Sequence, residues 1–309
     1  MTLTELRYIV AVARERHFGR AADACFVSQP TLSVAIRKLE EELKTQIFER
    51  TNTEVAMTSL GALIVDQAQR VLEEANSLKH LAQHGQDPLS GPLRLGAIYT
   101  IAPYLLPSLV RVAREQLPNV PLFLEENFTV RLLEMLRQGA LDCVVIAEPF
   151  PSTGLNQIDL YDEPFLVAVP KGHSWEDRKS IPHRELKEQN TLLLGTGHCF
   201  RDHVLGVCPE LNRLGSGSTI GEQRSFEGSS LETIRQMVAS GIGISVMPRT
   251  SASDVASPDQ LIRYIPFEEP VPTRRVCLVW RKNFPRSAAM TKLAEVIRQC
   301  ALPGVNYIG

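Results

Sequence analysis

The chain has 309 residues, of which 44% are hydrophobic and 22% are charged, a composition typical of a globular protein with two or three domains. A chain of this length can bury a sizeable core, so its folding does not require disulfide bonds. The formal net charge of −2 excludes a broadly basic surface, and any nucleic-acid binding must therefore come from a local patch.

Charged residues interrupt the first 20 positions, and no apolar run of about 18 residues occurs in the sequence. We therefore expect a cytoplasmic protein with no signal peptide, no transmembrane helix and no membrane partner. Structural disulfides are rare in that compartment, so a cysteine pair that oxidises there would be a sensor or a catalyst. The six cysteines are Cys25, Cys143, Cys199, Cys208, Cys277 and Cys300. Four of them lie on apolar faces of predicted elements, and we interpret them as small buried hydrophobic residues: Cys25, Cys143, Cys277 and Cys300.

The first 57 residues predict a helix-turn-helix followed by a short hairpin. A first helix is indicated by apolar residues at helical spacing, namely Leu6, Ile9, Val10 and Ala13. A short helix over 20–24 comes next, and Ser28 and Pro30 are typical of the N-cap and first turn of a third helix. The apolar face of that third helix is formed by Leu32, Ile36, Leu39 and Leu43.

The polar face of the third helix has small polar groups at its start and cations further on, as a DNA recognition helix does. Gln, Ser and Thr can reach base edges, and Arg and Lys can neutralise phosphates. The alternative is a small helical bundle with a solvated face, and the eight basic and eight acidic residues of 1–60 give no net positive charge. The candidate DNA-binding residues are Ser28, Gln29, Pro30, Thr31, Ser33, Arg37, Lys38 and Arg50.

Residues 47–58 predict a hairpin with Asn52 near its tip, which would be the wing of a winged helix-turn-helix. The motifs that carry a family resemblance are Phe18, Ala21-Ala22, the run 28–33, the run 36–40, Leu43, Phe48-Glu49-Arg50 and Thr58. At these positions the chain resembles the DNA-binding domain of LysR-type regulators. The resemblance implies a winged helix-turn-helix over residues 1–57 that binds double-stranded promoter DNA.

Residues 58–86 predict one long helix. Apolar and small residues follow alternating spacings of 4 and 3, as in a heptad seam: Met57, Gly61, Ile64, Ala68, Val71, Ala75, Leu78 and Ala82. A single helix packed on its own domain is the alternative. The resemblance to LysR-type regulators favours a dimerising linker helix, which would hold two recognition helices over successive half-sites.

Residues 87–309 predict an α/β domain, with the boundary at 86–92. Short strand-like apolar runs alternate with longer amphipathic segments, which favours mostly parallel sheets; the runs are 93–98, 120–124, 143–147, 165–169, 191–194, 242–246 and 276–280. The resemblance implies two lobes joined by crossing strands, as in periplasmic binding proteins. Lobe I would take about 91–161 and 269–300, and lobe II about 162–268.

The segment 194–209 is the most informative part of this domain. A strand ends at Leu194, a glycine-rich turn follows, and residues 200–207 look helical, so Cys199 would lie at a helix N-terminus. The free N–H groups and positive dipole end there favour a thiolate. A thiolate attacks peroxide and gives a sulfenic acid, with which a second thiol can condense.

If residues 199–208 are helical, the Cα atoms of Cys199 and Cys208 lie about 13 Å apart. A disulfide needs them within about 7 Å, so its formation would force the helix to unwind. Two alternatives stay open: both thiols are buried and inert, or zinc is bound by His198, Cys199, His203 and Cys208.

Three further motifs, 195–202 with Cys208, 98–107 and 231–239, resemble the peroxide-sensing branch of LysR-type regulators. The resemblance implies that Cys199 reacts with peroxide and Cys208 resolves it. It implies that Thr100 and Thr129 hold the peroxide, although either could instead be a helix cap. His198, Arg201 and Asp202 would tune the site. Arg274 would pair with the thiolate, with Arg275 beside it as the other candidate.

We therefore expect a peroxide-sensing transcription factor, not an enzyme, that needs no cofactor or metal. Its partners would be promoter DNA, RNA polymerase, hydrogen peroxide and further copies of itself in a homodimer or homotetramer. Two alternatives belong to other classes of function. One is a LysR-type regulator gated by an organic co-inducer between the lobes, and the other is a thiol peroxidase.

Overall fold

The computed structural model describes residues 1–50, 55–84, 89–211, 227–228, 230–252 and 261–309. It forms two compact units, Met1–Asp87 and Pro88–Gly309, and each is described by itself. The predicted wing tip at Asn52 and the side chain of Arg50 lie outside the described residues. In the described ranges, no helix combines the length and the hydropathy needed to cross a membrane.

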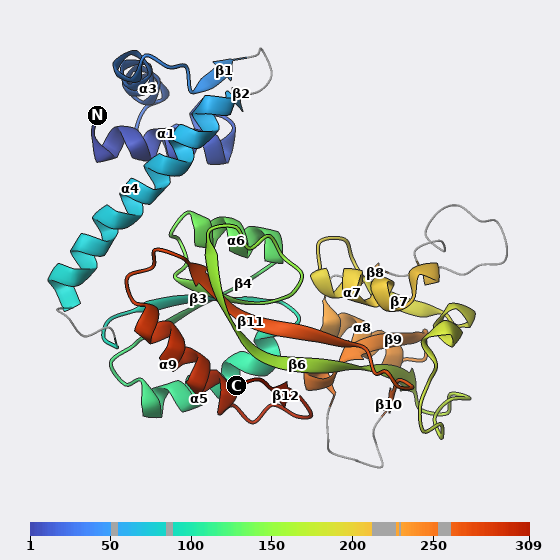
Figure 1. Ribbon diagram of the computed structural model, residues 1–309. Helices are drawn as coiled ribbons and strands as arrows, with labels where there is room; N and C mark the ends of the chain where they lie inside the picture. Colours follow the sequence, from blue (N-terminus) through green and yellow to red (C-terminus); the bar gives the residue numbers. More distant parts are fainter. Residues whose placement is uncertain (51–54, 85–88, 212–226, 229, 253–260) are drawn as a thin grey trace. The chain divides into compact units, whose positions relative to one another are not determined.

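The first unit is a helix-turn-helix with a small hairpin and a long helix (Figure 1). In chain order its elements are α1 (Leu3–Glu15), α2 (Phe18–Ala24), α3 (Gln29–Leu43), β1 (Phe48–Arg50), β2 (Val55–Met57) and α4 (Ser59–His84). The Ser28 side chain accepts a hydrogen bond from the backbone N–H of Thr31, which caps α3 as expected. Three residues that are spaced along α3 are fully buried, Leu32, Ile36 and Leu39, so this face of the helix forms the core.

Helix α4 packs tightly on its own unit at its beginning. A Cβ atom on Gly61 would lie 2.1 Å from the backbone oxygen of Ile47, so only glycine fits at this approach. Further along the predicted seam Ala68 is 3% exposed, whereas Leu78 is 69% exposed. Ile64 and Ala68 of the seam therefore pack on the core of this unit, whereas the Leu78 side chain is open to solvent.

The second unit is a mixed sheet covered by helices. Its elements are β3 (Leu93–Ile98), α5 (Ala102–Gln116), β4 (Leu122–Asn127), α6 (Thr129–Arg137), β5 (Cys143–Ala147), β6 (Leu155–Pro170), β7 (Thr191–Leu194), α7 (Cys199–Val207), β8 (Glu227–Gly228), α8 (Leu231–Ala239), β9 (Ile244–Pro248), β10 (Ile262–Pro266), β11 (Thr273–Arg281), α9 (Ser287–Arg298) and β12 (Asn306–Tyr307). The strand order is β4-β3-β5-β11-β6-β9-β7-β8, with β10 and β12 also paired to β6.

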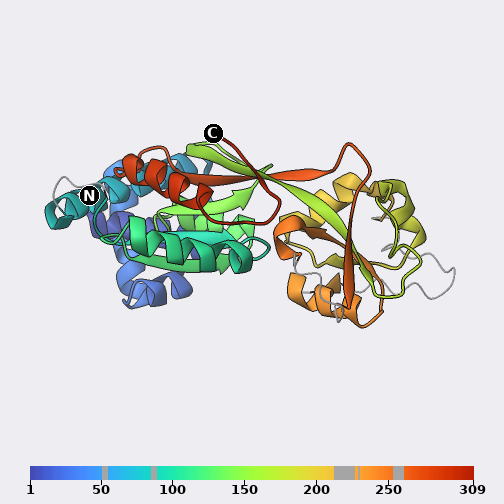
Figure 2. The ribbon, with the colours of Figure 1, turned by 90° about the horizontal axis from the view of Figure 1, so that it is seen from below.

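Two hydrophobic cores divide this unit into lobes. One core gathers β3, β4 and β5 with α5, α6 and α9, and the other gathers β7 and β9 with α7 and α8. The long strands β6 and β11 run side by side from one lobe into the other (Figures 1 and 2). They are the crossing strands that the family resemblance implied.

The expectation of mostly parallel sheets is wrong. Strand β3 is parallel to β4 and β5, and β7 is parallel to β8 and β9. Strand β11, however, is antiparallel to β5 and β6, and β6 is antiparallel to β9 and β10. The reason is topological: β6 carries the chain from lobe I to lobe II, and β11 must return in the opposite direction.

Candidate functional site

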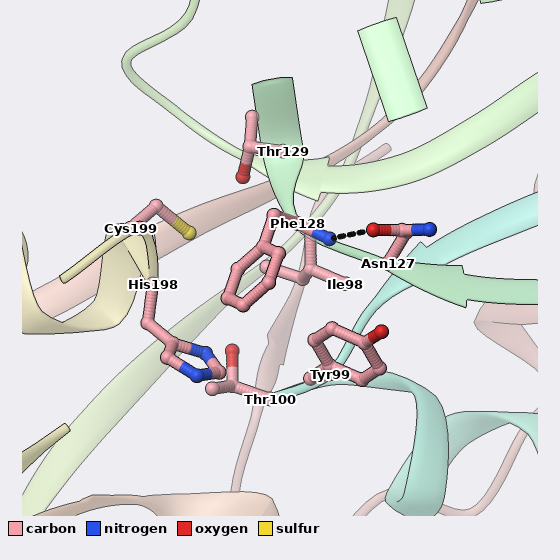
Figure 3. A pocket seen from close by; sticks show the side chains of 9 residues that line it. Ile98, Tyr99, Thr100, Asn127, Phe128, Thr129, His198 and Cys199 are labelled. Atoms are coloured by element: carbon pink, nitrogen blue, oxygen red, sulfur yellow. Dashed lines mark hydrogen bonds between the residues drawn. The ribbon is translucent and has the colours of Figure 1, made fainter. Parts of the chain in front are cut away.

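Cys199 is the first residue of α7 in lobe II, and its side chain lies against lobe I in a small pocket (Figure 3). The space between its atoms is about 170 Å³, a volume that includes open solvent at its mouth. Strands β3 and β4 are parallel neighbours that end together at the pair Ile98 and Asn127, so the residues that follow them meet at this edge. The lining residues are Ile98, Tyr99, Thr100, Asn127, Phe128, Thr129, Gly197, His198 and Cys199.

The two threonines contribute hydroxyl groups to the pocket. Thr100 Oγ1 accepts a hydrogen bond of 2.7 Å from Nη1 of Arg274. Thr129 is the first residue of α6, and its buried Oγ1 has no hydrogen-bond partner among the described residues. Neither threonine is the N-cap residue of its helix, since those positions are held by Ile101 and Phe128. The Thr129 hydroxyl and the Cys199 sulfur point into the same space (Figure 3).

His198 and aromatic rings form the wall beside the sulfur. The imidazole of His198 is buried and packs edge-on against Phe128, with ring centroids 4.8 Å apart. The Tyr99 ring lies 6.0 Å from the same imidazole. Gly197 brings the chain to this wall with φ +99°, a conformation that favours glycine. Among the described residues, then, aromatic rings and the two threonine hydroxyls line the pocket together, and the Phe128 ring lies between the hydroxyls (Figure 3).

Helix α7 separates the two predicted redox cysteines. Both thiols are free, and Cys208 is the C-cap of the helix that Cys199 begins. Nine residue steps along a helix correspond to about 13 Å, so a disulfide requires α7 to unwind. Burial raises the pKa of the Cys208 thiol, and its hydrogen bond to Glu210 raises it further.

The other predicted residues of this segment have different surroundings. Arg201 donates a hydrogen bond to the backbone oxygen of Leu194, which ties α7 to the end of β7. Asp202 is exposed in the first turn of α7. The four side chains considered for zinc do not form a cluster of ligand atoms in the described part of the chain.

Arg274 reaches the pocket through Thr100. Its buried guanidinium forms a 2.7 Å ion pair with Glu163 and donates to the backbone oxygen of Thr100 at 2.9 Å. It also lies 5.0 Å from the centre of the Phe200 ring. Arg275 is exposed and pairs with Asp162, so Arg274 is the arginine connected with the site. Its pairing with the Cys199 thiolate stays a prediction.

Sequence reasoning did not identify Glu163 or Phe128 as part of this site. Glu163 carried one signal, since it is an acidic residue two positions before the apolar run 165–169. Phe128 carried none, because an aromatic residue before a helix is ordinarily part of a core.

Two family models match the chain. The one described as bacterial regulatory helix-turn-helix protein, lysR family, matches residues 3–62, and the one described as LysR substrate binding domain matches residues 86–301. The chain belongs to the LysR family. A curated relative, the DNA-binding transcriptional dual regulator OxyR of Escherichia coli (strain K12), is 41% identical over 298 residues, which are 96% of this chain and 95% of the relative.

Solved structures of LysR-family proteins are similar as well. An aspartate-for-cysteine mutant of full-length OxyR from Pseudomonas aeruginosa is 48% identical with a TM-score of 0.75, and covers 98% of this chain and 96% of its own. A cysteine mutant of OxyR from Corynebacterium glutamicum with hydrogen peroxide bound is 31% identical with a TM-score of 0.64, at 97% and 92% coverage. The predicted fold class, a helix-turn-helix with a two-lobe regulatory domain, is confirmed.

In this LysR-family chain, the start of α3 presents the predicted DNA-binding residues to solvent. Gln29, Pro30 and Thr31 are exposed, as are Arg37 and Lys38 further along the helix, whereas Ser33 is half-buried. Ser28 is exposed too, but its hydroxyl is also hydrogen-bonded to that of Thr31 at 2.8 Å. Ser28 therefore has a capping role in addition to its predicted contact with DNA.

Glu163→Gln should destabilise the regulatory domain strongly. The substitution leaves the Arg274 guanidinium buried without its counterion, which costs about 3–5 kcal/mol of unfolding free energy. Urea denaturation of the full chain measures this cost. Arg275→Gln is the matched control, because its exposed pair with Asp162 contributes little. Equal stability losses in the two variants would contradict this account of the buried pair.

Proposed function

We propose that this chain is a peroxide-sensing LysR-type transcription regulator in which Cys199 is the reacting group. The observation that carries the proposal is the small pocket in which the Cys199 sulfur and the unpartnered Thr129 hydroxyl share one space. Relatives of this chain are named hydrogen peroxide-inducible genes activator. A peroxide molecule has two oxygens and two hydrogens, so it can accept a bond from one hydroxyl while it meets the sulfur.

In the first step the Cys199 thiolate attacks one peroxide oxygen. A sulfur–oxygen bond forms, the oxygen–oxygen bond breaks, and the leaving hydroxide takes a proton to become water. The Thr129 hydroxyl is free to donate a hydrogen bond to the peroxide. Thr100 accepts from Arg274, so its own proton is also available to an oxygen in the pocket. The His198 ring forms the wall of the pocket together with Phe128.

In the second step the Cys208 thiol attacks the Cys199 sulfenic acid. A sulfur–sulfur bond forms, the sulfur–oxygen bond breaks, and a second water leaves, so two electrons pass from the cysteines to the peroxide. Because α7 holds the two sulfurs apart, this step requires the helix to unwind. Phe200 and Val204 then leave the lobe II core, which changes the surface of the regulatory domain.

The repacked regulatory domains would alter how a homodimer or homotetramer holds its helix-turn-helix units on promoter DNA, and with that the contact to RNA polymerase. The Cys199 pocket suits peroxide better than an organic co-inducer, because its space of about 170 Å³, open solvent included, is below the range of about 300–1,000 Å³ of usual small-molecule sites. A sensor reacts once per signal, so we infer regulation rather than peroxidase turnover.

The decisive experiment is mass spectrometry of the full chain before and after one equivalent of hydrogen peroxide. We expect one new disulfide, between the peptides that carry Cys199 and Cys208, and a changed footprint on promoter DNA. Cys199→Ser should abolish both changes, and Cys208→Ser should stop at the sulfenic acid. A footprint that still shifts with peroxide in Cys199→Ser would overturn the proposal.

Thr129→Val should slow oxidation without harming the fold. The substitution keeps the shape of the side chain and removes a buried hydroxyl that has no partner, so stability should stay the same or rise by about 1 kcal/mol. The second-order rate of Cys199 oxidation should fall about tenfold, as expected for one lost hydrogen bond to the reactant. Stopped-flow peroxide kinetics and thermal unfolding measure the two effects; a destabilised variant with an unchanged rate would contradict this role.

Gly206→Ala should slow disulfide closure selectively. Gly206 lies within α7, and a Cβ atom added there meets nothing within 4 Å. Alanine favours the helix by about 1 kcal/mol over glycine, so unwinding and closure should slow about fivefold. Quenched-flow trapping of the sulfenic acid separates the two steps. The rate of sulfenic acid formation serves as the internal control and should stay constant.

A further inference from the structure

His203 and Cys199 lie on the same face of α7. They are four residues apart, the spacing that places side chains one above the other on a helix. Phe200 and Val204, also four apart, form another face that is buried in the core of lobe II. Cys199 packs against the core of lobe I, and His203 hydrogen-bonds to lobe I. One stripe of the helix therefore anchors it in its own lobe, and the other faces the neighbouring lobe.

The contact made by His203 joins the two lobes. Its Nε2 lies 2.6 Å from the backbone oxygen of Glu148, which directly follows β5 in lobe I. A carbonyl oxygen only accepts, so Nε2 must carry the proton and donate it. The ring centroids of Phe165 and Phe200 lie 6.3 Å and 6.5 Å from the centroid of the imidazole, so the His203 ring packs against apolar surfaces.

The second ring nitrogen has no such partner. Nδ1 of His203 is buried and unbonded among the described residues. In the neutral ring it is a lone-pair acceptor, whereas a proton added there would be a buried donor without an acceptor. Burial of the unpartnered Nδ1 thus suits the neutral imidazole and opposes the charged one, whereas either form of the ring can donate from Nε2 to the Glu148 oxygen.

Burial and the charged groups around His203 together lower its pKa, which favours the neutral ring. Burial lowers the pKa of His203 below its usual 6.5, the hydrogen bond to the Glu148 oxygen offsets part of this, and the Arg274 guanidinium from β11 lowers the pKa further. Asp202, next to it on α7, acts in the opposite direction, and Glu163 on β6 is already paired with Arg274. Cys199 lies one turn earlier on the same face of α7.

We propose that His203 is a positioning residue for Cys199: its neutral, Nε2-protonated ring holds α7 of lobe II against the Glu148 carbonyl of lobe I, and protonation of the ring releases the helix. The proposal rests on the proposed function, since it concerns the step in which α7 unwinds.

When the helix unwinds, His203 reaches water and binds a proton near its usual pKa of 6.5. The unwound state then binds more protons, so the docked helix is most stable above pH 6.5 and weakens as the pH falls below it.

Hydrogen exchange of the reduced full chain tests the contact without any redox chemistry. The Cys199→Ser background removes the thiol from this face of α7, and His203→Gln retains an amide donor but cannot take up a proton. Between pH 8 and pH 5.5, the opening of the backbone amides of 203–208, corrected for intrinsic exchange, should rise about fivefold to tenfold with His203. It should stay flat with His203→Gln, and α6 should not respond in either protein.

A second measurement follows disulfide closure. The closure rate of the wild-type chain, divided by that of His203→Gln, should rise about fivefold to tenfold as the pH falls from 8 to 5.5. The ratio of their sulfenic acid formation rates should stay constant over the same range. Dividing the rates removes the pH dependence of the thiol attack itself.

A wild-type chain that forms no disulfide would overturn the proposed function, and the exchange experiment would still decide the role of His203. Exchange of α7 that is independent of pH, or equally dependent in both variants, would overturn the positioning role.

Discussion

Helix α7 holds two sulfur atoms at its opposite ends, too far apart to bond while the helix exists. This constraint determines what the rest of the regulatory domain must provide. Phe200 and Val204 anchor the helix in lobe II, so it is formed in the reduced protein. In the proposed mechanism the pocket needs only to admit a small oxidant, because unwinding of the helix would convert a change at one sulfur atom into a rearrangement of nine residues.

The buried pair of Arg274 and Glu163 ties this helix to the pocket. The arginine contacts Thr100 on the lobe I side and the Phe200 ring on the lobe II side, and the carboxylate also accepts a hydrogen bond from the backbone N–H of Thr250 at 2.9 Å. Both partners lie on the crossing strands, β6 and β11. A charge pair at the junction of the lobes therefore contacts residues on both sides of the Cys199 pocket.

Local signals predicted the local elements well. Ser28 and Pro30 marked the start of α3, and apolar runs marked the strands at 93–98 and 143–147. The direction of β6 was not predictable, since its lobe I half is polar and only its later residues form an apolar run. The pair of Arg274 and Glu163 joins residues 111 positions apart, and the unpartnered hydroxyl of Thr129 exists only in the folded site. Resemblance identified several residues of the pocket, but it did not indicate these contacts.

The close approach at Gly61 has a mechanical consequence for the DNA-binding unit. Backbone lies against backbone there, so the start of α4 and the residue before β1 cannot slide past one another. A side chain of α3 reinforces the junction, because Glu40 accepts hydrogen bonds from the amides of Ile47 and Phe48. A rotation of α4 about its axis would thus turn the recognition helix α3 and the hairpin with it as one rigid unit.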